Sequence, residues 1–334
     1  MVYVIAEIGN NHNGSVKKCL ELIDAASETG VDAIKIQSFT GLDICTPTLE
    51  TADYPDWDTK GFKYWFEFAD SIALPLEAHQ EVIDYTKSKN LDFITTPVSS
   101  RIVNFLETLS GINAYKLASM DLNNFELISS LSKTTKPIIL STGMSSLNEI
   151  SGVVSAFKDN DISILHCVSD YPLDPINASL QNIKILSNIY PNIKIGFSDH
   201  SLGKELAISA VTLGAKIIEK HFTLDRNDKN AAEHHFSMLP DEFRQMVEWI
   251  KVIDTNLSEK DWARSRNEKN GKKQYRRSFH YLRDLAVGHK IEMSDLTFLR
   301  PGNAIDFNDL EKVLNKPLTR SIKTYDPCLE DDFI

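Results

Sequence analysis

The fold of this chain is decided by residues 196–225, which read GFSDHSLGKELAISAVTLGAKIIEKHFTLD. An apolar run leads into His200, a helical pattern follows over 203–214, and a second apolar run leads into His221. This order predicts two parallel neighbouring strands that are joined by a helix. Because both histidines end their strands, we expect the two imidazole rings to emerge side by side at the carboxyl ends of the strands.

Alternation of side chains along a strand places Ser198 on the same face as His200, and Glu219 on the same face as His221. Two neutral imidazoles in a cleft at strand ends, with oxygen ligands nearby, suit a divalent metal ion that keeps open positions for a substrate. Either histidine considered alone is more easily explained as an unrelated surface or core residue. The metal site therefore depends on what the other strands contribute.

Short apolar runs alternate with helical patterns throughout residues 1–255. The expected strands are 3–8, 33–37, 92–95, 114–117, 137–140, 163–168, 194–197 and 216–220. The first helix is capped by Ser15 and stopped by Gly30, and later ones are expected at about 77–89, 100–109, 124–133, 145–158, 177–188, 203–213 and 240–254. These units predict an α/β fold, a (β/α)8 TIM barrel. A doubly wound open sheet is the alternative, but it rarely reaches eight such regular units.

The rest of the chain departs from this alternation. Residues 41–75 are rich in Pro, Trp, Tyr and acidic residues, and we expect a lid or an interface there rather than disorder. Residues 256–277 are charged with little apolar periodicity, which predicts a linker or a solvated helix. Residues 278–334 contain short strand-like pieces and turns, which predicts a small separate domain that docks on a barrel.

Composition limits the class of partner. The net charge of −11 argues against nucleic acid and against an anionic membrane surface. No apolar run is long enough for a membrane span, and Met1 leads directly into a strand without a basic segment typical of a secretory signal. The four cysteines are scattered without a metal-binding spacing. We therefore expect a reduced, cytoplasmic protein.

All eight predicted strands end in polar or ionisable residues, and in a barrel those ends meet at one rim. Lys35 and Lys116 are embedded in apolar strand residues, where an ammonium ion needs an anionic partner or a lowered pKa. One explanation is that each lysine pairs with a carboxylate such as Glu7 or Asp121. A second is that both lysines hold the phosphate and carboxylate of a substrate. The neutral donors available for that purpose are Ser119, Ser141 and Thr142. A third makes one lysine the Schiff-base nucleophile of a metal-free aldolase, and the two histidines argue against it.

Several runs, taken in order, match a known pattern. In the barrel region they are AEIGNNHNG (6–14), IKIQ (34–37), TTP (95–97), YKLAS (115–119), LSTGM (140–144), LHCVSDYP (165–172), GFSDHS (196–201) and IEKHFT (218–223). Near the end of the chain they are RRS (276–278) and LRPGN (299–303). With these runs the chain resembles the N-acetylneuraminate (sialic acid) synthase family, which includes legionaminic and pseudaminic acid synthases. The small domain resembles the antifreeze-like (SAF) domain that these synthases carry.

The resemblance implies an enzyme that condenses phosphoenolpyruvate with an N-acylated aminosugar, which gives a nine-carbon 3-deoxy-ulosonic acid and phosphate. N-acetylmannosamine is the acceptor in the sialic acid branch, and diacetamido-trideoxyhexoses are the acceptors in the other two. The resemblance also implies that His200 and His221 hold Mn2+ or Mg2+, which binds the aldehyde oxygen of the sugar as a Lewis acid. Imidazole ligands lean toward Mn2+. A non-catalytic sugar-binding protein is the remaining alternative.

The same resemblance implies roles for individual residues. Glu7 is implied to steer water and protons near C2 of phosphoenolpyruvate, and Asp121 is implied to be another active-site acid. Lys35 and Lys116 are counted with these catalytic residues, because positive charge makes phosphate a better leaving group. The residues implied to bind substrates are Gln37, Thr96, Ser119, Ser141, Tyr171, Ser198 and Glu233. Arg300 matches an arginine that the small domain inserts into the barrel of a neighbouring subunit, which implies a domain-swapped homodimer.

Departures from the family pattern fall near the sugar. Asp121 stands where some members have Glu, and Ala304 replaces a glycine of the small domain. Residues 231–234 read AAEH where the family often has Gly-Pro-Asp-His, so Glu233 takes the place of a sugar-binding aspartate. The motifs for metal and phosphoenolpyruvate match, so the reaction type is better determined than the sugar. Among the other histidines, His166 is interpreted as a core residue. His12, His234 and His235 are interpreted as loop residues, with or without a contact to substrate.

Overall fold

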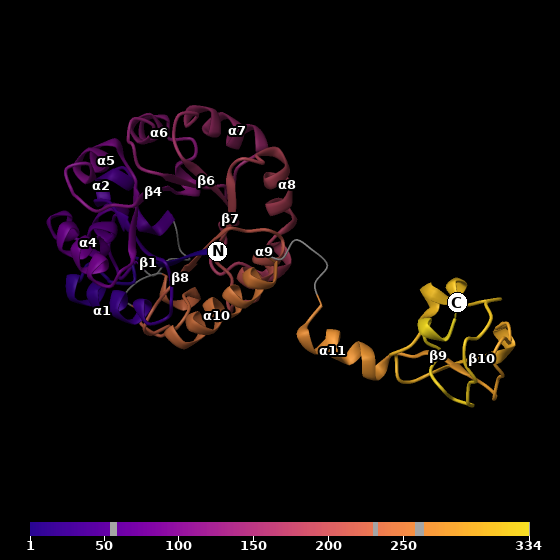
Figure 1. The fold of residues 1–334 in the computed structure, drawn as a ribbon. Coiled ribbons are helices and arrows are strands. Elements are labelled where there is room, and N and C mark those ends of the chain that lie inside the picture. Colours follow the sequence, from indigo (N-terminus) through magenta and orange to yellow (C-terminus); the bar gives the residue numbers. More distant parts are fainter. Residues whose placement is uncertain (54–58, 230–232, 258–263, 334) are drawn as a thin grey trace. The chain divides into compact units, whose positions relative to one another are not determined.

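The computed structural model describes residues 1–53, 59–229, 233–257 and 264–333. The chain divides into two compact units, Met1–Ser258 and Glu259–Ile334. The first unit is a closed barrel of eight parallel strands with helices around it, and the strands follow one another in chain order (Figure 1).

The strands of the barrel lie within two residues of their predicted ends. They are β1 (Tyr3–Gly9), β2 (Ala33–Ser38), β3 (Asp92–Pro97), β4 (Ala114–Leu117), β5 (Ile138–Ser141), β6 (Ile162–Cys167), β7 (Lys194–Asp199) and β8 (Ile217–His221). The register pairs β1 with β2 on one side and with β8 on the other. An open sheet leaves its edge strands with one neighbour each, so this closure confirms the TIM barrel.

The helices of this unit bury one apolar face each against the strands. They are α1 (Val16–Ser27), α4 (His79–Ser88), α5 (Ser100–Leu106), α6 (Phe125–Leu131), α7 (Leu147–Ala156), α8 (Gln181–Ile189), α9 (Glu205–Thr212) and α10 (Pro240–Leu257). The helix α1 begins as predicted, because the Ser15 side chain accepts a hydrogen bond from the Lys18 amide. Its buried face packs into the large apolar core between strands and helices.

A second apolar cluster fills the interior of the barrel. Its buried members come from seven different strands and are Ile5, Ala33, Ile94, Ala114, Ile139, Leu165 and Ile217. Because successive side chains alternate between the helix-facing and the interior side, the residue two positions further along each strand also points inward. The apolar cluster is therefore the floor under the groups at the carboxyl ends of the strands.

The segment 41–75 is folded where the structure describes it. It contains α2 (Gly41–Ile44) and α3 (Trp65–Ile72), and it has a small core of its own in which Phe39 and Phe68 are buried. Gly41 lies so close to α3 that an added Cβ would be 2.0 Å from the Phe66 carbonyl oxygen. The role of this segment as a lid or an interface stays a prediction, and residues 54–58 lie outside the described residues.

The second unit contains α11 (Arg266–Tyr275), and an antiparallel pair is formed by β9 (Ser278–Tyr281) and β10 (Leu296–Leu299). Its core includes Phe279, Tyr281 and Ile322. The predicted linker is partly helical, since α11 is capped by Ser265, and residues 258–263 of it lie outside the described residues. Among the helices described in either unit, none has the length and apolar composition needed to cross a membrane.

Candidate active site at the mouth of the barrel

A layer of polar side chains lies directly above the apolar floor of the barrel. Each strand supplies one member, two residues beyond the floor position, and all eight are buried. The members are Glu7, Lys35, Thr96, Lys116, Ser141, Cys167, Ser198 and Glu219. Burying polar or ionisable groups in a core is costly unless they are paired, so a complete layer of them at the catalytic end of a barrel indicates a site rather than packing.

Two ion pairs run across this layer. The Lys35 ammonium lies 2.7 Å from Glu7 and donates to the Thr96 hydroxyl over 3.1 Å. The Lys116 ammonium donates to both carboxylate oxygens of Glu219, over 2.8 and 3.0 Å. The expected pairing of a lysine with Glu7 is thus found for Lys35. The partner of Lys116 is Glu219 rather than Glu7 or Asp121, because Glu219 projects inward from the far side of the barrel toward Lys116.

Charges in the layer shift the pKa values of its members. Burial alone would raise the pKa of Glu219, but the Lys116 and Lys35 ammonium ions hold it at about 2. Burial raises the pKa of Glu7 and outweighs the opposing effect of Lys35. Burial would lower the pKa of Lys35, yet Glu219 and Glu7 raise it. Lys35 is therefore a permanent cation, and Glu7 is the carboxyl group in this layer that is most easily protonated.

The two histidines stand one step above the layer, with ring centroids 5.5 Å apart. The Nδ1 atom of His200 is 2.8 Å from the Val168 carbonyl oxygen. Since a carbonyl oxygen only accepts, Nδ1 carries the proton and Nε2 keeps its lone pair. The Nδ1 atom of His221 is buried without a hydrogen-bond partner among the described residues, and it lies 3.5 Å from a Glu233 oxygen.

Glu233 reaches this group from the segment after β8. Its carboxylate accepts hydrogen bonds from the Gln37 side chain over 3.1 Å and from the Asn10 amide over 2.9 Å. Gly9 has a φ of +54°, and a Cβ added there would lie 2.0 Å from the Glu233 carboxylate. A glycine at position 9 is thus required both for the backbone conformation and for the approach of Glu233. Residues 231–232, just before it, lie outside the described residues.

The remaining predicted residues line the rim. Ser119 accepts a hydrogen bond from the Gly143 amide over 2.9 Å, and the Ser141 hydroxyl is buried without a partner among the described residues. Asp121 ends the short helical turn Ser119–Asp121, and burial raises its pKa to about 6. The Tyr171 ring packs 4.2 Å from that of His200, centroid to centroid.

Arg300 lies outside the barrel unit that holds this group. It belongs to the second unit, where it is exposed at the end of β10. Its contact with a sugar in a neighbouring barrel stays a prediction.

Two members of the polar layer carry no sequence-based assignment, Glu219 and Cys167. Glu219 could have been found from its inward face, which it shares with His221, and from the need of two buried lysines for two carboxylates. Cys167 resembles an ordinary core residue in its apolar strand. Its sulfur nevertheless lies 3.9 Å from Nδ1 of His200.

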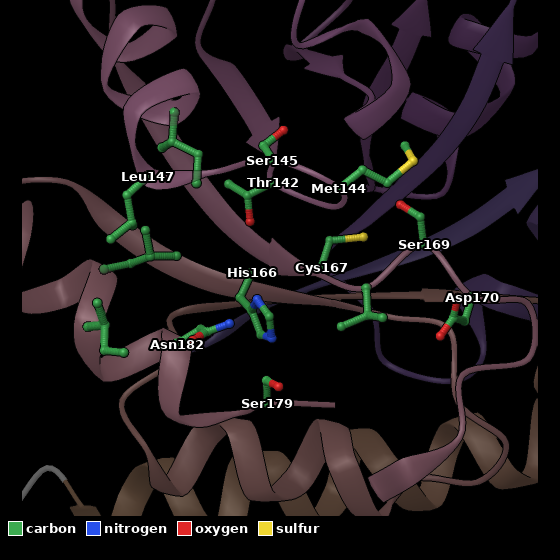
Figure 2. A pocket seen from close by; sticks show the side chains of 14 residues that line it. Thr142, Met144, Ser145, Leu147, His166, Cys167, Ser169, Asp170, Ser179 and Asn182 are labelled. Atoms are coloured by element: carbon green, nitrogen blue, oxygen red, sulfur yellow. The ribbon is translucent and has the colours of Figure 1, made fainter. Parts of the chain in front are cut away.

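A cavity of about 440 Å3 adjoins Cys167 and extends between α7 and α8 (Figure 2). Figure 2 shows the Cys167 sulfur on the side of Ser169 and Met144, and the His166 ring on the side of Ser179. His166 is buried, and its Nε2 donates to the Ala178 carbonyl over 2.7 Å, so its interpretation as a core histidine is confirmed. His12 is also buried and accepts from the Gly14 amide, which makes it a loop-stabilising residue.

The donor atoms at the mouth fit a divalent ion that shares its coordination with a substrate. Among the described residues, no three His, Cys, Asp or Glu side chains form a ready-made metal cluster. The protein instead offers two imidazoles, one with a free lone pair on Nε2 and one with an orphaned buried Nδ1, and a carboxylate beside them. Such a partial set suits a catalytic ion with open positions better than a structural one.

Comparison with known proteins identifies the family of the chain. Residues 22–261 match the NeuB family and residues 276–334 match the SAF domain. The chain is 31% identical to N,N'-diacetyllegionaminic acid synthase of Campylobacter jejuni, over 96% of this chain and 96% of the relative. It is 31% identical to pseudaminic acid synthase of the same organism, over 99% of this chain and 96% of the relative.

A solved structure of N-acetylneuraminic acid (sialic acid) synthetase from Leptospira borgpetersenii superposes with a TM-score of 0.70 and 30% identity, covering 80% of this chain and 89% of that one. The family match covers most of the chain, the relatives match over nearly their full length, and the solved structure has the same fold. The chain therefore belongs to the NeuB family and carries a SAF domain at its end.

Proposed function

We propose that this protein condenses phosphoenolpyruvate with an N-acylated aminosugar, N-acetylmannosamine or a relative of it, to give a nine-carbon 3-deoxy-ulosonic acid and phosphate. The observation that carries the proposal is the buried polar layer of the barrel, in which two lysines stand below two paired imidazoles. A polar layer with two lysines for anions, under two imidazoles for a metal ion, suits a reaction between an anionic phosphate ester and a sugar aldehyde.

The second acceptor class is a diacetamido-trideoxyhexose. Its support is the names of two relatives that the chain matches over nearly its whole length, a legionaminic acid synthase and a pseudaminic acid synthase. Glu233 and Tyr171 stand where the acceptor would enter, beside His221 and His200 respectively. The choice between acceptors is made by these side chains, since the polar layer beneath them serves phosphoenolpyruvate in either case.

The cofactor in this proposal is Mn2+ or Mg2+ held by His200 and His221, with Glu233 beside them. Lys35 and Lys116 are matched in charge by Glu7 and Glu219, and Glu233 adds a further negative charge. A trianionic substrate would be repelled from such a site unless a cation offsets the excess. When bound, the ion supplies a Lewis acid for the carbonyl oxygen of the sugar.

The lysines bind and orient phosphoenolpyruvate. Lys116 uses two N–H groups on Glu219, and Lys35 uses its own on Glu7 and Thr96, so each ammonium keeps one donor for a substrate oxygen. The Ser141 hydroxyl, buried and unpartnered among the described residues, is a further donor. Glu7, whose pKa is raised by burial, is suited to pass a proton at C2 as that carbon is hydrated.

The lysine aldolase alternative is disfavoured by the same contacts. A Schiff base requires a neutral amine at the moment of attack. Lys35 is held as an ammonium ion by two carboxylates. Burial lowers the pKa of Lys116, but its amine is bound by both carboxylate oxygens of Glu219, which lies on the same strand as His221. Reduction with borohydride in the presence of pyruvate should leave the protein without a covalent adduct.

A domain-swapped homodimer is part of the proposal, with Arg300 contributed to a neighbouring barrel. Its support is the SAF domain match and the exposure of Arg300 at the end of β10. The exposed guanidinium is free to bind the N-acyl carbonyl of a sugar.

The activity is tested by phosphate release with phosphoenolpyruvate and a panel of acceptors, with each substrate omitted in turn. We expect release only when both substrates are present, loss of release with EDTA, and recovery on addition of Mn2+ or Mg2+. Full activity in EDTA would contradict the metal role, and release without an acceptor would contradict the condensation. Sugar binding by calorimetry without turnover would instead support the non-catalytic alternative.

A further inference from the structure

A buried ion pair lies behind the two histidines, on the opposite face of the same strands. The Lys220 ammonium donates to the Asp199 carboxylate over 2.7 Å, and each side chain is about 1% exposed. Asp199 and Lys220 are also the last paired residues of β7 and β8. Each therefore immediately precedes one of the imidazoles in the chain.

This pair lies on the helix-facing side of the strands, where the other side chains are apolar. Lys220 lies between Ile218 and Phe222, which are both fully buried in the core between strands and helices. A buried ion pair adds little stability over apolar residues of the same size, because two charges must lose their water. Such a pair instead fixes the relative position of the two strands that carry it. Because Asp199 and Lys220 adjoin His200 and His221, the pair also fixes the strand ends that carry the two imidazoles.

The contacts of the pair enclose the backbone of His200. One Asp199 oxygen accepts from the Ser201 amide over 2.9 Å and from the Ser201 hydroxyl over 2.7 Å, which closes the turn around His200. Lys220 donates a second hydrogen bond, over 2.7 Å, to the Ser201 carbonyl. The strand pairing ends at Asp199, so this lysine side chain replaces the missing main-chain bond and ties residue 201 to β8.

We infer that Asp199 and Lys220 are positioning residues that hold the imidazoles of His200 and His221 at a fixed separation for a shared divalent ion. The inference rests on the proposed metal role of the two histidines. Neither residue touches the ion or a substrate. Each acts through the backbone next to a histidine, while the front of the site is held by Val168 and Glu233.

The first measurement is Mn2+ affinity, by calorimetry with the metal alone, on full-length protein. We expect Lys220→Met and Asp199→Asn each to weaken Mn2+ binding about 10- to 100-fold, as for residues that orient ligands. We expect the double variant to lose no more than the worse single variant, because both changes remove the same contact. At saturating Mn2+, KM for phosphoenolpyruvate should stay close to that of the unmodified protein.

A control is Lys136→Met, which removes a partly exposed ion pair, between Lys136 and Glu107 at 2.5 Å, on another part of the barrel. It should cost stability without changing Mn2+ affinity. If Lys136→Met weakens Mn2+ binding as much as Lys220→Met does, or if Lys220→Met leaves it unchanged, the positioning role is wrong. The isosteric Asp199→Asn, which removes a charge but little volume, keeps the test valid should Lys220→Met fail to fold.

A second readout needs no metal. The 15N shifts of the His200 ring in the metal-free protein report which nitrogen carries the proton. Nδ1 should be the protonated nitrogen in the unmodified protein, and Lys220→Met should mix the two tautomers. If the unmodified protein binds no Mn2+ but Lys220→Met mixes the tautomers of His200, the proposed cofactor is wrong and the positioning of the ring is still supported. An unchanged ring signal in Lys220→Met would overturn the positioning.

Discussion

The Lys116 ammonium is bound by both oxygens of Glu219, at 2.8 and 3.0 Å, across the interior of the barrel. Both side chains are buried, and Glu219 also accepts from the Ser198 hydroxyl over 2.9 Å. Glu219 thus accepts hydrogen bonds from Lys116 on the opposite strand, β4, and from Ser198 on the neighbouring strand, β7. It stands two residues before His221, so the polar layer and the proposed metal site share one strand.

Replacement of Lys116 should lower the stability of the protein, because it leaves the buried Glu219 carboxylate unpaired. Lys116→Met leaves Glu219 buried without its partner, and we expect a loss of about 3–5 kcal/mol in the free energy of unfolding. The double variant Lys116→Met with Glu219→Gln removes the stranded charge and should regain most of that stability. Neither variant should release phosphate at more than about a hundredth of the normal rate. Urea denaturation checks the first expectation, and equal instability of the single and double variants would contradict it.

Asp121 should make stability depend on pH. Burial raises its pKa from 3.8 to about 6, so the folded state holds this proton more tightly than the unfolded chain does. The stabilisation is fully present below the unfolded pKa and is lost as pH rises through about 6, by at most about 3 kcal/mol. Asp121→Asn cannot ionise. Its stability relative to the unmodified protein should therefore increase between about pH 4 and pH 7, which denaturation at the two pH values measures. A constant difference would show that Asp121 is not perturbed.

Gly9 and Gly214 form a matched pair of glycines. Both have positive φ, +54° and +106°, but an added Cβ meets the Glu233 carboxylate at 2.0 Å in one case and nothing within 4 Å in the other. Gly9→Ala should displace Glu233 and lower kcat/KM for the aminosugar by about 100-fold. Gly214→Ala should show the backbone strain alone, with lower stability and unchanged KM values. Equal kinetic effects in the two variants would remove Glu233 from the sugar site.

The proposed exchange of Arg300 between subunits can be tested by mixing two inactive proteins. Arg300→Ala keeps a complete barrel, and Lys35→Met keeps a complete second unit. Co-expressed subunits should regain activity if one subunit supplies Arg300 to the other, because one site of each mixed dimer is then complete. A mixture that stays inactive, although light scattering shows dimers, would place Arg300 at the barrel of its own chain.

The barrel could be predicted from the sequence because its buried parallel strands are short apolar runs at regular spacing. The ends of β4 are the predicted ones, and β7 and β8 extend one or two residues further, through Asp199 and His221. The inward face of each strand could also be predicted, which is why Lys35 and Glu7 were placed together. Helix content within 41–75 could not, because its aromatic residues serve a local core and not a regular stripe.

The alternation of residues in the sequence could not predict which side chains pair across the barrel. Alternation shows that Lys116 and Glu219 both face inward, but not that they meet, since three strands lie between β4 and β8 on either side of the ring. The ion pair between Asp199 and Lys220 could not be predicted from the sequence for a different reason. A charged residue at a strand end is usually exposed, and only the three-dimensional packing shows these two to be enclosed by α-helices and apolar neighbours.

The register that places Glu7 opposite His221 joins the first strand of the barrel to the last. During synthesis Glu7 is made first, whereas Glu219 and His221 of the proposed site are added only with the last strand, β8. A fragment that ends before residue 217 therefore lacks Glu219 and His221, and with them the partner of Lys116 and half of the proposed metal site. In the proposed mechanism, a copy without the last strand therefore does not consume substrate.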